Sequence, residues 1–251
     1  MYEEHSLFEK PTDENAKIWR YLDFTKFVSL LDRRALFFPR ADMLADPFEG
    51  SYSRANVALR PTVYKDLPKE SLEKMFEQHR TLSREIRRFT LINCWHIGEH
   101  ESAAMWRLYL KSDEGVAVQS TFARLADSFR DCAEHTVHIG KVNYIDYETD
   151  WLPEGNSFYP FLHKRTSFEH ERELRAIIQK LPVADGGGVD WTKELFDVGV
   201  YVPVDLDALI ESVFVSPTAP TWFGELVRCV TRKYGLEKEV MQSQLGQDPV
   251  Y

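Results

Sequence analysis

The chain has 251 residues, of which 43% are hydrophobic, 13% aromatic and 28% charged. This composition excludes a disordered chain, a collagen-like fibre and a small disulfide scaffold, because each of those classes has its own strong compositional bias. Lysine and arginine number 31 against 40 aspartates and glutamates, which gives a formal charge of -9. An acidic chain argues against extended, non-specific binding of nucleic acid, since such binding depends on many contacts between cations and phosphates.

The cysteines and the apolar runs indicate the cellular setting. Cys94, Cys132 and Cys229 are widely spaced and odd in number, so they favour neither a disulfide framework nor a zinc ribbon. Residues 1–14 are acidic and lack the basic start and apolar run of a signal peptide. No apolar run approaches the ~18–20 residues of a membrane span. We therefore expect a cytoplasmic protein that does not bind a membrane.

The first half of the chain alternates between strand-like and helix-like segments. Residues 18–40 are typical of a strand, a helix that Thr25 would cap, and a second strand ended by Pro39. Residues 65–88 are dense in charge, with apolar positions at helical spacing, and predict one or two amphipathic helices. A buried strand is expected over 89–95 and a short helix around 105–110.

The second half continues in the same way. Strands are predicted at 115–120, 137–147, 174–178, 198–204 and 213–215, with helices at 121–129, 205–211 and 222–234. This irregular mixture predicts one α+β domain over residues 1–251, with a mixed or antiparallel sheet and helices packed on it. Residues 1–15 and 243–251 are expected to be loosely packed tails.

One short pattern has the spacing of a metal site. His96, Glu99 and His100 fit H-x-x-E-H, in which two histidines four apart on a helix hold zinc beside a catalytic glutamate. Gly98 would weaken such a helix by about 1 kcal/mol relative to alanine. The segment also follows a predicted strand directly, so a solvated loop is the simpler interpretation and no metal is expected.

Residues 165–175 carry the densest chemistry of the chain. If the segment is extended from Glu171, then Glu171, Glu173 and Arg175 share one face of a strand, where a glutamate lining a cleft could act as a general base or stabilise a cation. If it is helical, Glu171 and Arg175 form an ordinary ion pair four residues apart. By spacing alone the ion pair is the simpler interpretation.

Two further motifs are candidates for ligand binding. In Asp46-Pro-Phe-Glu49-Gly50, the proline and the glycine predict a rigid turn that presents two carboxylates to a ligand or to an arginine elsewhere. Trp106 and Tyr109 share one face of the expected helix around 105–110. Such an aromatic stripe belongs to a core more often than to a stacking surface.

Taken together, these motifs resemble a bacterial family of cytoplasmic proteins known as a domain of unknown function. The family has an N-terminal N-D-P-F-E, a central M-W-x-x-Y and a late E-x-E-x-R, matched here by DPFEG, MWRLY and the segment around Glu171-Arg172-Glu173. The likeness extends from Trp19 nearly to the C-terminus. It departs at Ala45, where the family often has asparagine. The resemblance implies that the motifs converge on one cleft, with Asp46 and Glu49 near residues 171–175.

More distantly, the chain order is similar to that of the ADP-ribosyltransferase fold, which has an arginine on the first strand, then a helix, an aromatic segment and a late glutamate. This resemblance implies an NAD-consuming enzyme acting on a macromolecule, in a bacterial toxin or phage-defence setting. The catalytic carboxylate would be Glu173 or Glu171. The ligand-binding residues would be Arg20, Asp46, Glu49, Trp106, Tyr109, Lys164 and Arg175.

Two other functions compete with this one. A non-catalytic module that binds a ligand or a partner protein of a defence locus could use the same cleft without turnover. A zinc-dependent hydrolase would instead use His96, Glu99 and His100.

Overall fold

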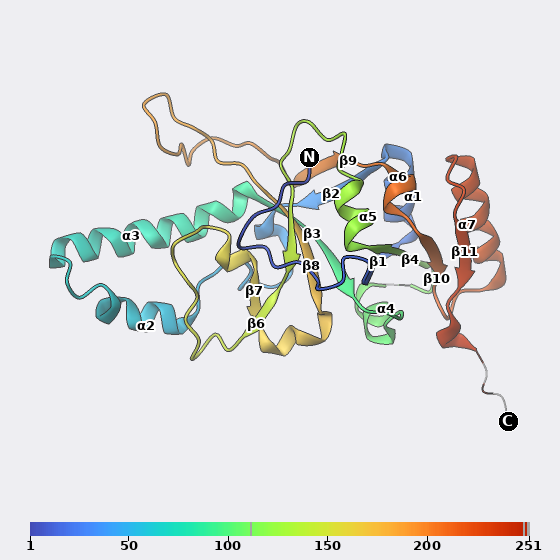
Figure 1. Cartoon of the computed structure of the whole chain (residues 1–251), viewed down its shortest axis with the longest axis horizontal. Coiled ribbons are helices and arrows are strands. Elements are labelled where there is room, and N and C mark those ends of the chain that lie inside the picture. The colour runs from blue at the N-terminus through green and yellow to red at the C-terminus, as the bar shows by residue number, and fades with distance from the viewer. Residues whose placement is uncertain (111, 248, 250–251) are drawn as a thin grey trace.

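The computed structural model describes residues 1–110, 112–247 and 249 (Figure 1). A seven-stranded sheet forms its centre. In order across the sheet, the strands are β11 (Glu239–Gln242), β10 (Ser212–Val215), β4 (Gly115–Thr121), β1 (Lys17–Asp23), β3 (Thr90–Ile97), β8 (Glu173–Gln179) and β5 (His138–Lys141). All neighbours are antiparallel except β10 and β11, which are parallel. The predicted α+β fold with a mixed sheet is confirmed.

Two small sheets and seven helices complete the described part of the fold. β2 (Ala35–Pro39) pairs with β9 (Gly199–Pro203), and β6 (Asn143–Ile145) pairs with β7 (His163–Arg165). The helices are α1 (Phe24–Arg33), α2 (Arg54–Val63), α3 (Lys69–Glu85), α4 (Ala103–Tyr109), α5 (Phe122–Asp127), α6 (Leu206–Leu209) and α7 (Thr221–Lys233). Helices α2 and α3 form an arm that extends from one end of the molecule, and α7 lies at the opposite end beside β11 (Figure 1).

Strand alternation divides the core between the two faces of the sheet. Ile18 and Leu22 of β1 belong to the main core, together with apolar side chains of α1, β2, α5 and α6. Trp19 and Tyr21 point to the other face, where they pack with Met105 of α4. Because successive strand residues face opposite ways, Arg20 lies on the same face as Ile18 and Leu22. A strand that is buried on both faces therefore carries a single cationic residue at its centre.

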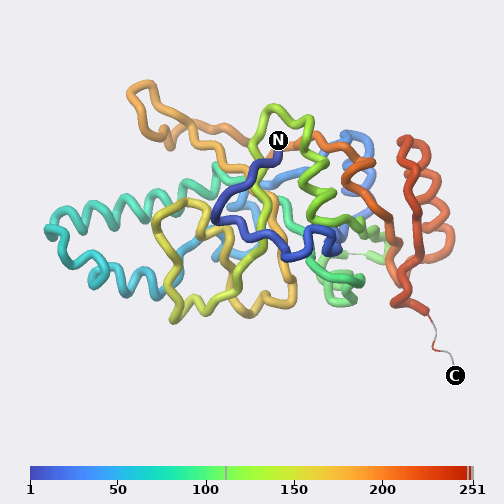
Figure 2. The backbone as a smooth tube through the Cα atoms, in the orientation of Figure 1, coloured from blue at the N-terminus to red at the C-terminus, as the bar shows by residue number. Residues whose placement is uncertain are grey.

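The N-terminal segment is packed along β5, which is an edge strand of the central sheet. The backbone N–H of Glu3 donates to the Val137 carbonyl, and that of Lys141 donates to the Glu9 carbonyl. Phe8 is buried and packs against Ile177 and its neighbours. Figure 2 shows the segment running over this side of the sheet. The prediction of a loose tail over 1–15 is wrong, because these residues cover an edge that would otherwise expose its backbone.

The C-terminal tail is described only in part. Ser243 is buried, whereas Gln244–Gly246 form a 3-10 turn whose residues are exposed, so the prediction of a loosely packed tail is wrong only for Ser243. Residues 248, 250 and 251 lie outside the described residues.

Several predicted boundaries differ from the structure for local reasons. Helix α1 begins one residue before Thr25, and Asp23 occupies the N-cap position without a side-chain cap. The expected strand 137–147 is two strands, β5 and β6, which pair in different sheets. The sequence gives no clear signal for α2, because Pro61 lies inside it. Strand β11 was not predicted, because it lies in a segment of mostly polar residues.

Helices of the described residues do not combine the length and the apolar character that crossing a bilayer requires.

Candidate functional site

A cavity of about 670 Å³ lies where strands β1 and β3 separate. β1 pairs with β4 along its whole length, but it pairs with β3 only at Ile18 and Trp19. Beyond these positions the two strands diverge, and α1, β2, α4 and β9 complete the wall. The volume falls within the roughly 300–1,000 Å³ typical of small-molecule sites. The divergence of the two strands thus gives the sheet a ligand-sized opening.

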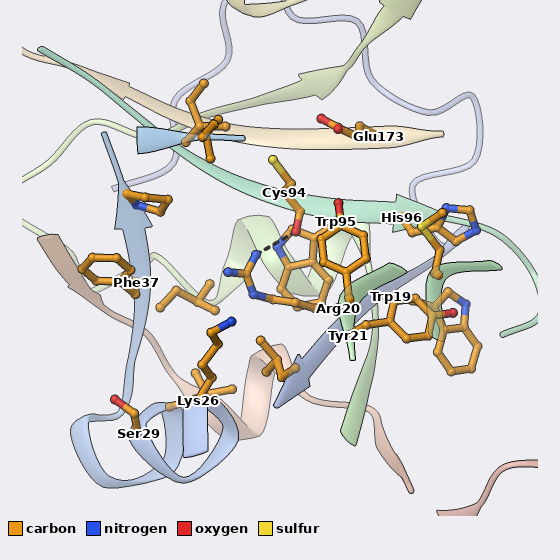
Figure 3. Close-up of a pocket in the computed structure, with 18 of the residues that line it drawn as sticks. Trp19, Arg20, Tyr21, Lys26, Ser29, Phe37, Cys94, Trp95, His96 and Glu173 are labelled. Carbon is orange, nitrogen blue, oxygen red and sulfur yellow. Dashed lines mark hydrogen bonds between the residues drawn. The ribbon is translucent and has the colours of Figure 1, made fainter. Parts of the chain in front are cut away.

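The cavity has an aromatic and apolar wall with a small number of ionisable groups. Its aromatic lining is contributed by Trp19, Tyr21, Phe37, Trp95, Tyr109 and Tyr201. Its ionisable and nucleophilic lining is contributed by Arg20, Lys26, Cys94, His96, Glu171 and Glu173. Figure 3 shows that Arg20 from β1 and Lys26 from α1 both point into this space. A lining of this kind suits a ligand that has flat rings and an anionic group.

Arg20 bridges the two separating strands. Its Nη1 donates to the Asn93 Oδ1 at 2.9 Å. It also donates to the Cys94 carbonyl at 2.7 Å (Figure 3). Its guanidinium also lies 5.9 Å from the centre of the Trp95 ring. Among the described residues no carboxylate lies within ion-pair distance of Arg20, whereas Lys26 is paired with Asp23 at 2.9 Å. Arg20 is therefore a cation whose charge is available to an anionic ligand.

Lys164, Glu173 and Arg175 form one buried ion network, and of these three residues Glu173 alone lines the cavity. Lys164 Nζ lies 2.6 Å from Glu173 Oε1, and Arg175 Nε lies 2.5 Å from Glu173 Oε2. Lys164 also contacts Glu171 Oε2. Arg175 is 1% exposed and holds both oxygens of Glu49, at 2.5 and 2.9 Å. Lys164 and Arg175 thus pair with three largely buried carboxylates, those of Glu49, Glu171 and Glu173.

The predicted convergence of the motifs on one region is confirmed for Glu49, which joins Arg175 across 126 positions of the chain. Asp46 instead accepts a hydrogen bond from Arg165 Nη2 at 2.9 Å and another from the Phe48 N–H at 3.0 Å. Glu49 and Asp46 do not line the cavity. The DPFEG loop therefore supports the site from behind rather than forming its surface.

Opposite shifts in pKa distinguish the two candidate catalytic carboxyls. Burial raises the pKa of Glu171, and the neighbouring Glu173 charge raises it further, to about 7. Burial also works to raise the pKa of Glu173, but the charges of Arg175 and Lys164 outweigh it and hold that pKa well below its usual value. Of the two carboxyls, Glu171 is therefore the one that takes up a proton more readily, and Glu173 is the one held as an anion. Such a divided pair is the usual arrangement for assigning an acid–base role.

Neither alternative for residues 171–175 is correct. Glu171 and Glu173 do not share a strand, and Arg175 lies in β8 and pairs with Glu49 and Glu173 rather than with Glu171. Glu171 ends a 3-10 segment, Thr166–Glu171, and Arg172 follows it with a φ of 42° in the left-handed region. Strand β8 begins only at Glu173. The reversal at Arg172 brings both carboxylates to the same lysine from different backbone directions, which an extended strand would not do.

The aromatic residues of α4 have different positions. Tyr109 lines the cavity, and burial raises the pKa of its phenol, so it stays neutral. Trp106 is 3% exposed, packs edge-on against Tyr21 at 5.0 Å, and donates from Nε1 to Glu101 Oε2 at 2.8 Å. Trp106 is therefore a core residue, and only Tyr109 remains a candidate for stacking on a ligand.

The helix that the H-x-x-E-H pattern requires is absent from residues 96–100. His96 lies in β3, which ends at Ile97, and Glu99 and His100 lie exposed in the turn that follows. The Nδ1 of His96 lies 2.6 Å from the Glu171 carbonyl, and burial lowers the pKa of His96. Within residues 1–110, 112–247 and 249, no three histidine, cysteine or acidic side chains are grouped to hold a metal ion. His96 and His100 therefore do not lie one turn apart on a helix, as the H-x-x-E-H pattern requires.

Sequence reasoning missed several residues of the cavity. Cys94 and Tyr21 lie on strands that the sequence identified, so strand alternation beside Arg20 and Glu173 could have indicated them. Burial raises the pKa of the Cys94 thiol to about 12, so this cysteine is not a thiolate at neutral pH. Tyr201 and Phe37 come from the small β2–β9 sheet, and no local signal connects that sheet to the site.

Gly50, the last residue of the DPFEG loop, gives a first test of the supporting structure. Its φ is 69°, and an added Cβ would overlap the Phe161 ring. Gly50→Ala is expected to lower the free energy of unfolding by about 2–4 kcal/mol, from the left-handed backbone and from overpacking. Urea denaturation measures this change. Gly186→Ala is the control, because a Cβ there meets no atom within 4 Å. An equal effect of both substitutions would contradict the argument.

No protein-family model matches the chain, and a search of curated proteins found no match either.

Proposed function

We propose that the cavity binds NAD and that the protein is an ADP-ribosyltransferase-like enzyme that modifies a macromolecule. The observation that carries the proposal is the placement of Arg20 and the Glu171–Glu173 pair in the walls of one cavity. NAD has an anionic pyrophosphate, two flat rings and a glycosidic bond whose rupture develops positive charge. The cavity supplies an available guanidinium, an aromatic wall and a carboxylate pair for these three features.

Arg20 is assigned to the pyrophosphate, because a guanidinium offers planar, bidentate donors to phosphate oxygens. Lys26, whose side chain is 65% exposed in its pair with Asp23, adds positive charge at the same side. Tyr109 is assigned to the nicotinamide ring, since a neutral phenol presents an apolar face for stacking. Each of these residues lines the cavity.

The transfer would proceed by breakage of the bond between the ribose C1′ and the nicotinamide nitrogen, with the bonding electrons passing to nicotinamide. The cationic ribosyl centre that forms would be stabilised by the fixed charge of Glu173. A nucleophilic oxygen or nitrogen of the acceptor then bonds to C1′, and its proton passes to the Glu171 carboxylate. Nicotinamide leaves as a neutral molecule, so atoms and charges balance without a metal ion or a redox partner.

Calorimetric titration with NAD, followed by an assay of released nicotinamide in the presence of cell lysate, tests the proposal. Arg20→Met is expected to weaken NAD binding about tenfold to a hundredfold, which corresponds to the loss of charge-assisted hydrogen bonds. Arg54→Met is the control, since Arg54 is 73% exposed and paired with Glu148 on the outer surface. Its affinity for NAD should equal that of the unmodified protein.

Absence of NAD binding would overturn the proposed function. Binding of NAD without release of nicotinamide or labelling of any macromolecule would favour the non-catalytic module, which uses the same cavity without turnover. Equal losses in Arg20→Met and Arg54→Met would show that the cavity is not where NAD binds.

A further inference from the structure

Lys164 lies between two carboxylates that come from different backbone segments. It belongs to the short strand β7, which pairs with β6 rather than with the central sheet. Its Nζ contacts Glu171 Oε2 and lies 2.6 Å from Glu173 Oε1. The ammonium also lies 4.6 Å from the centre of the Phe168 ring. Lys164 is only 8% exposed, so these protein contacts fix the position of its side chain.

The two carboxylates differ in how many of their oxygens are engaged. Glu173 has Oε1 on Lys164 and Oε2 on Arg175, so both of its oxygens are committed to cations. Glu171 has only Oε2 on Lys164, and within the described part of the chain its Oε1 has no hydrogen-bond partner. Both residues line the cavity. The oxygen that can accept a proton from a bound acceptor therefore belongs to Glu171.

We propose that Lys164 is a positioning residue of this site, which holds the Glu171 carboxylate beside Glu173 and orients it toward the cavity. This inference rests on the proposed function. It assigns Glu173, together with Arg175 and Glu49, to a fixed anionic support. Lys164 acts through Glu171 and does not itself touch the substrate.

Lys164 favours the ionised form of Glu171, whereas burial and the charge of Glu173 disfavour it. Burial and the Glu173 charge raise the pKa of Glu171 to about 7, and the Lys164 charge and hydrogen bond lower it. Removal of the Lys164 charge should therefore raise this pKa further. The titratable and charged groups around Glu171 are Lys164 of β7, Glu173 of β8, His96 of β3, Tyr109 of α4, Arg20 of β1, and the adjacent His170 and Arg172.

The activity test compares pH profiles of nicotinamide release. Lys164→Met is expected to move the acidic limb of the profile upward by about one to three pH units, the range expected when an opposite charge is removed from contact distance. Lys164→Arg keeps the charge and should restore the original limb. The control is Lys141→Met, because Lys141 lies on neighbouring β5 and pairs with Glu9 outside the network. The acidic limb of the Lys141→Met profile should lie at the same pH as that of the unmodified protein.

A second measurement does not require turnover. In carbon-13 NMR of protein labelled at the glutamate side-chain carboxyl, one signal should titrate near pH 7 and disappear in Glu171→Gln. In Lys164→Met the same signal should titrate at higher pH. If Lys164→Met does not fold, Lys164→Gln serves instead, because it keeps a donor for the carboxylates without the charge.

The two measurements separate failure of this inference from failure of the proposed function. If the Glu171 carboxyl signal titrates as expected but NAD does not bind, the NAD assignment is overturned. The effect of Lys164 on Glu171 would then still hold. Turnover whose acidic limb is identical in Lys164→Met and in the unmodified protein would overturn the role of Lys164. A limb that moves equally in Lys164→Met and Lys141→Met would also overturn it, because a general electrostatic change would then be the cause.

Discussion

Arg175→Met is expected to lower the free energy of unfolding by about 3–5 kcal/mol, because it leaves buried carboxylates without their cation. Arg175 holds both oxygens of Glu49 and one of Glu173, and it donates from Nη1 to the Phe161 carbonyl at 2.7 Å. Methionine fills a similar volume but replaces none of these donors. The loss should therefore come from unpaired charge rather than from a cavity.

Urea denaturation at neutral pH measures this loss, and Arg80→Met is its control. Arg80 is 71% exposed and pairs with Glu77 within α3, so its removal should change the free energy of unfolding by less than about 0.5 kcal/mol. The double variant Glu49→Gln, Arg175→Met should be less unstable than the sum of its single variants, because the two residues form one interaction. A loss of less than about 1 kcal/mol in Arg175→Met, compared with the ~3–5 expected, would contradict a buried network.

Glu171→Gln is expected to reduce nicotinamide release about 10²–10⁴-fold, the usual contribution of a positioned general base. The amide keeps the size of the side chain, but it cannot accept the proton of the acceptor. NAD binding should be nearly unchanged, since Arg20 and Tyr109 are assigned to the ligand. Steady-state kinetics should therefore show a loss in kcat rather than in KM.

Two neighbouring carboxamide variants make this result specific. Glu169→Gln is the matched control, because Glu169 is exposed on the same 3-10 segment and should keep full activity. Glu173→Gln removes the anion between Lys164 and Arg175, so it should lower stability as well as turnover. Full activity in Glu171→Gln, with loss only in Glu173→Gln, would transfer the catalytic role to Glu173.

The site could be predicted from the sequence only where its signals are local. Turn chemistry identified the DPFEG loop, and strand composition placed Arg20 on the first strand of the sheet. The joining of Glu49 with the segment around Arg175 was expected from the set of motifs and is confirmed at 2.5 Å. The spacing of His96, Glu99 and His100 does not by itself distinguish a helix from the end of a strand. The strand predicted just before it favoured a loop, and the structure has a loop after Ile97.

The sequence by itself determined the α+β class, most of the strands and the residues that could carry charge chemistry, because alternation and turn residues act over a few neighbouring positions. Only the tertiary structure decided that β1 and β3 separate beyond Trp19, since pairing depends on contacts between distant segments. The same applies to the carboxylates. The left-handed turn at Arg172 and the position of Lys164 leave an oxygen of Glu171 open, while Glu173 is enclosed by cations. Identical side chains two positions apart thus differ through desolvation and charge, which the three-dimensional fold alone determines.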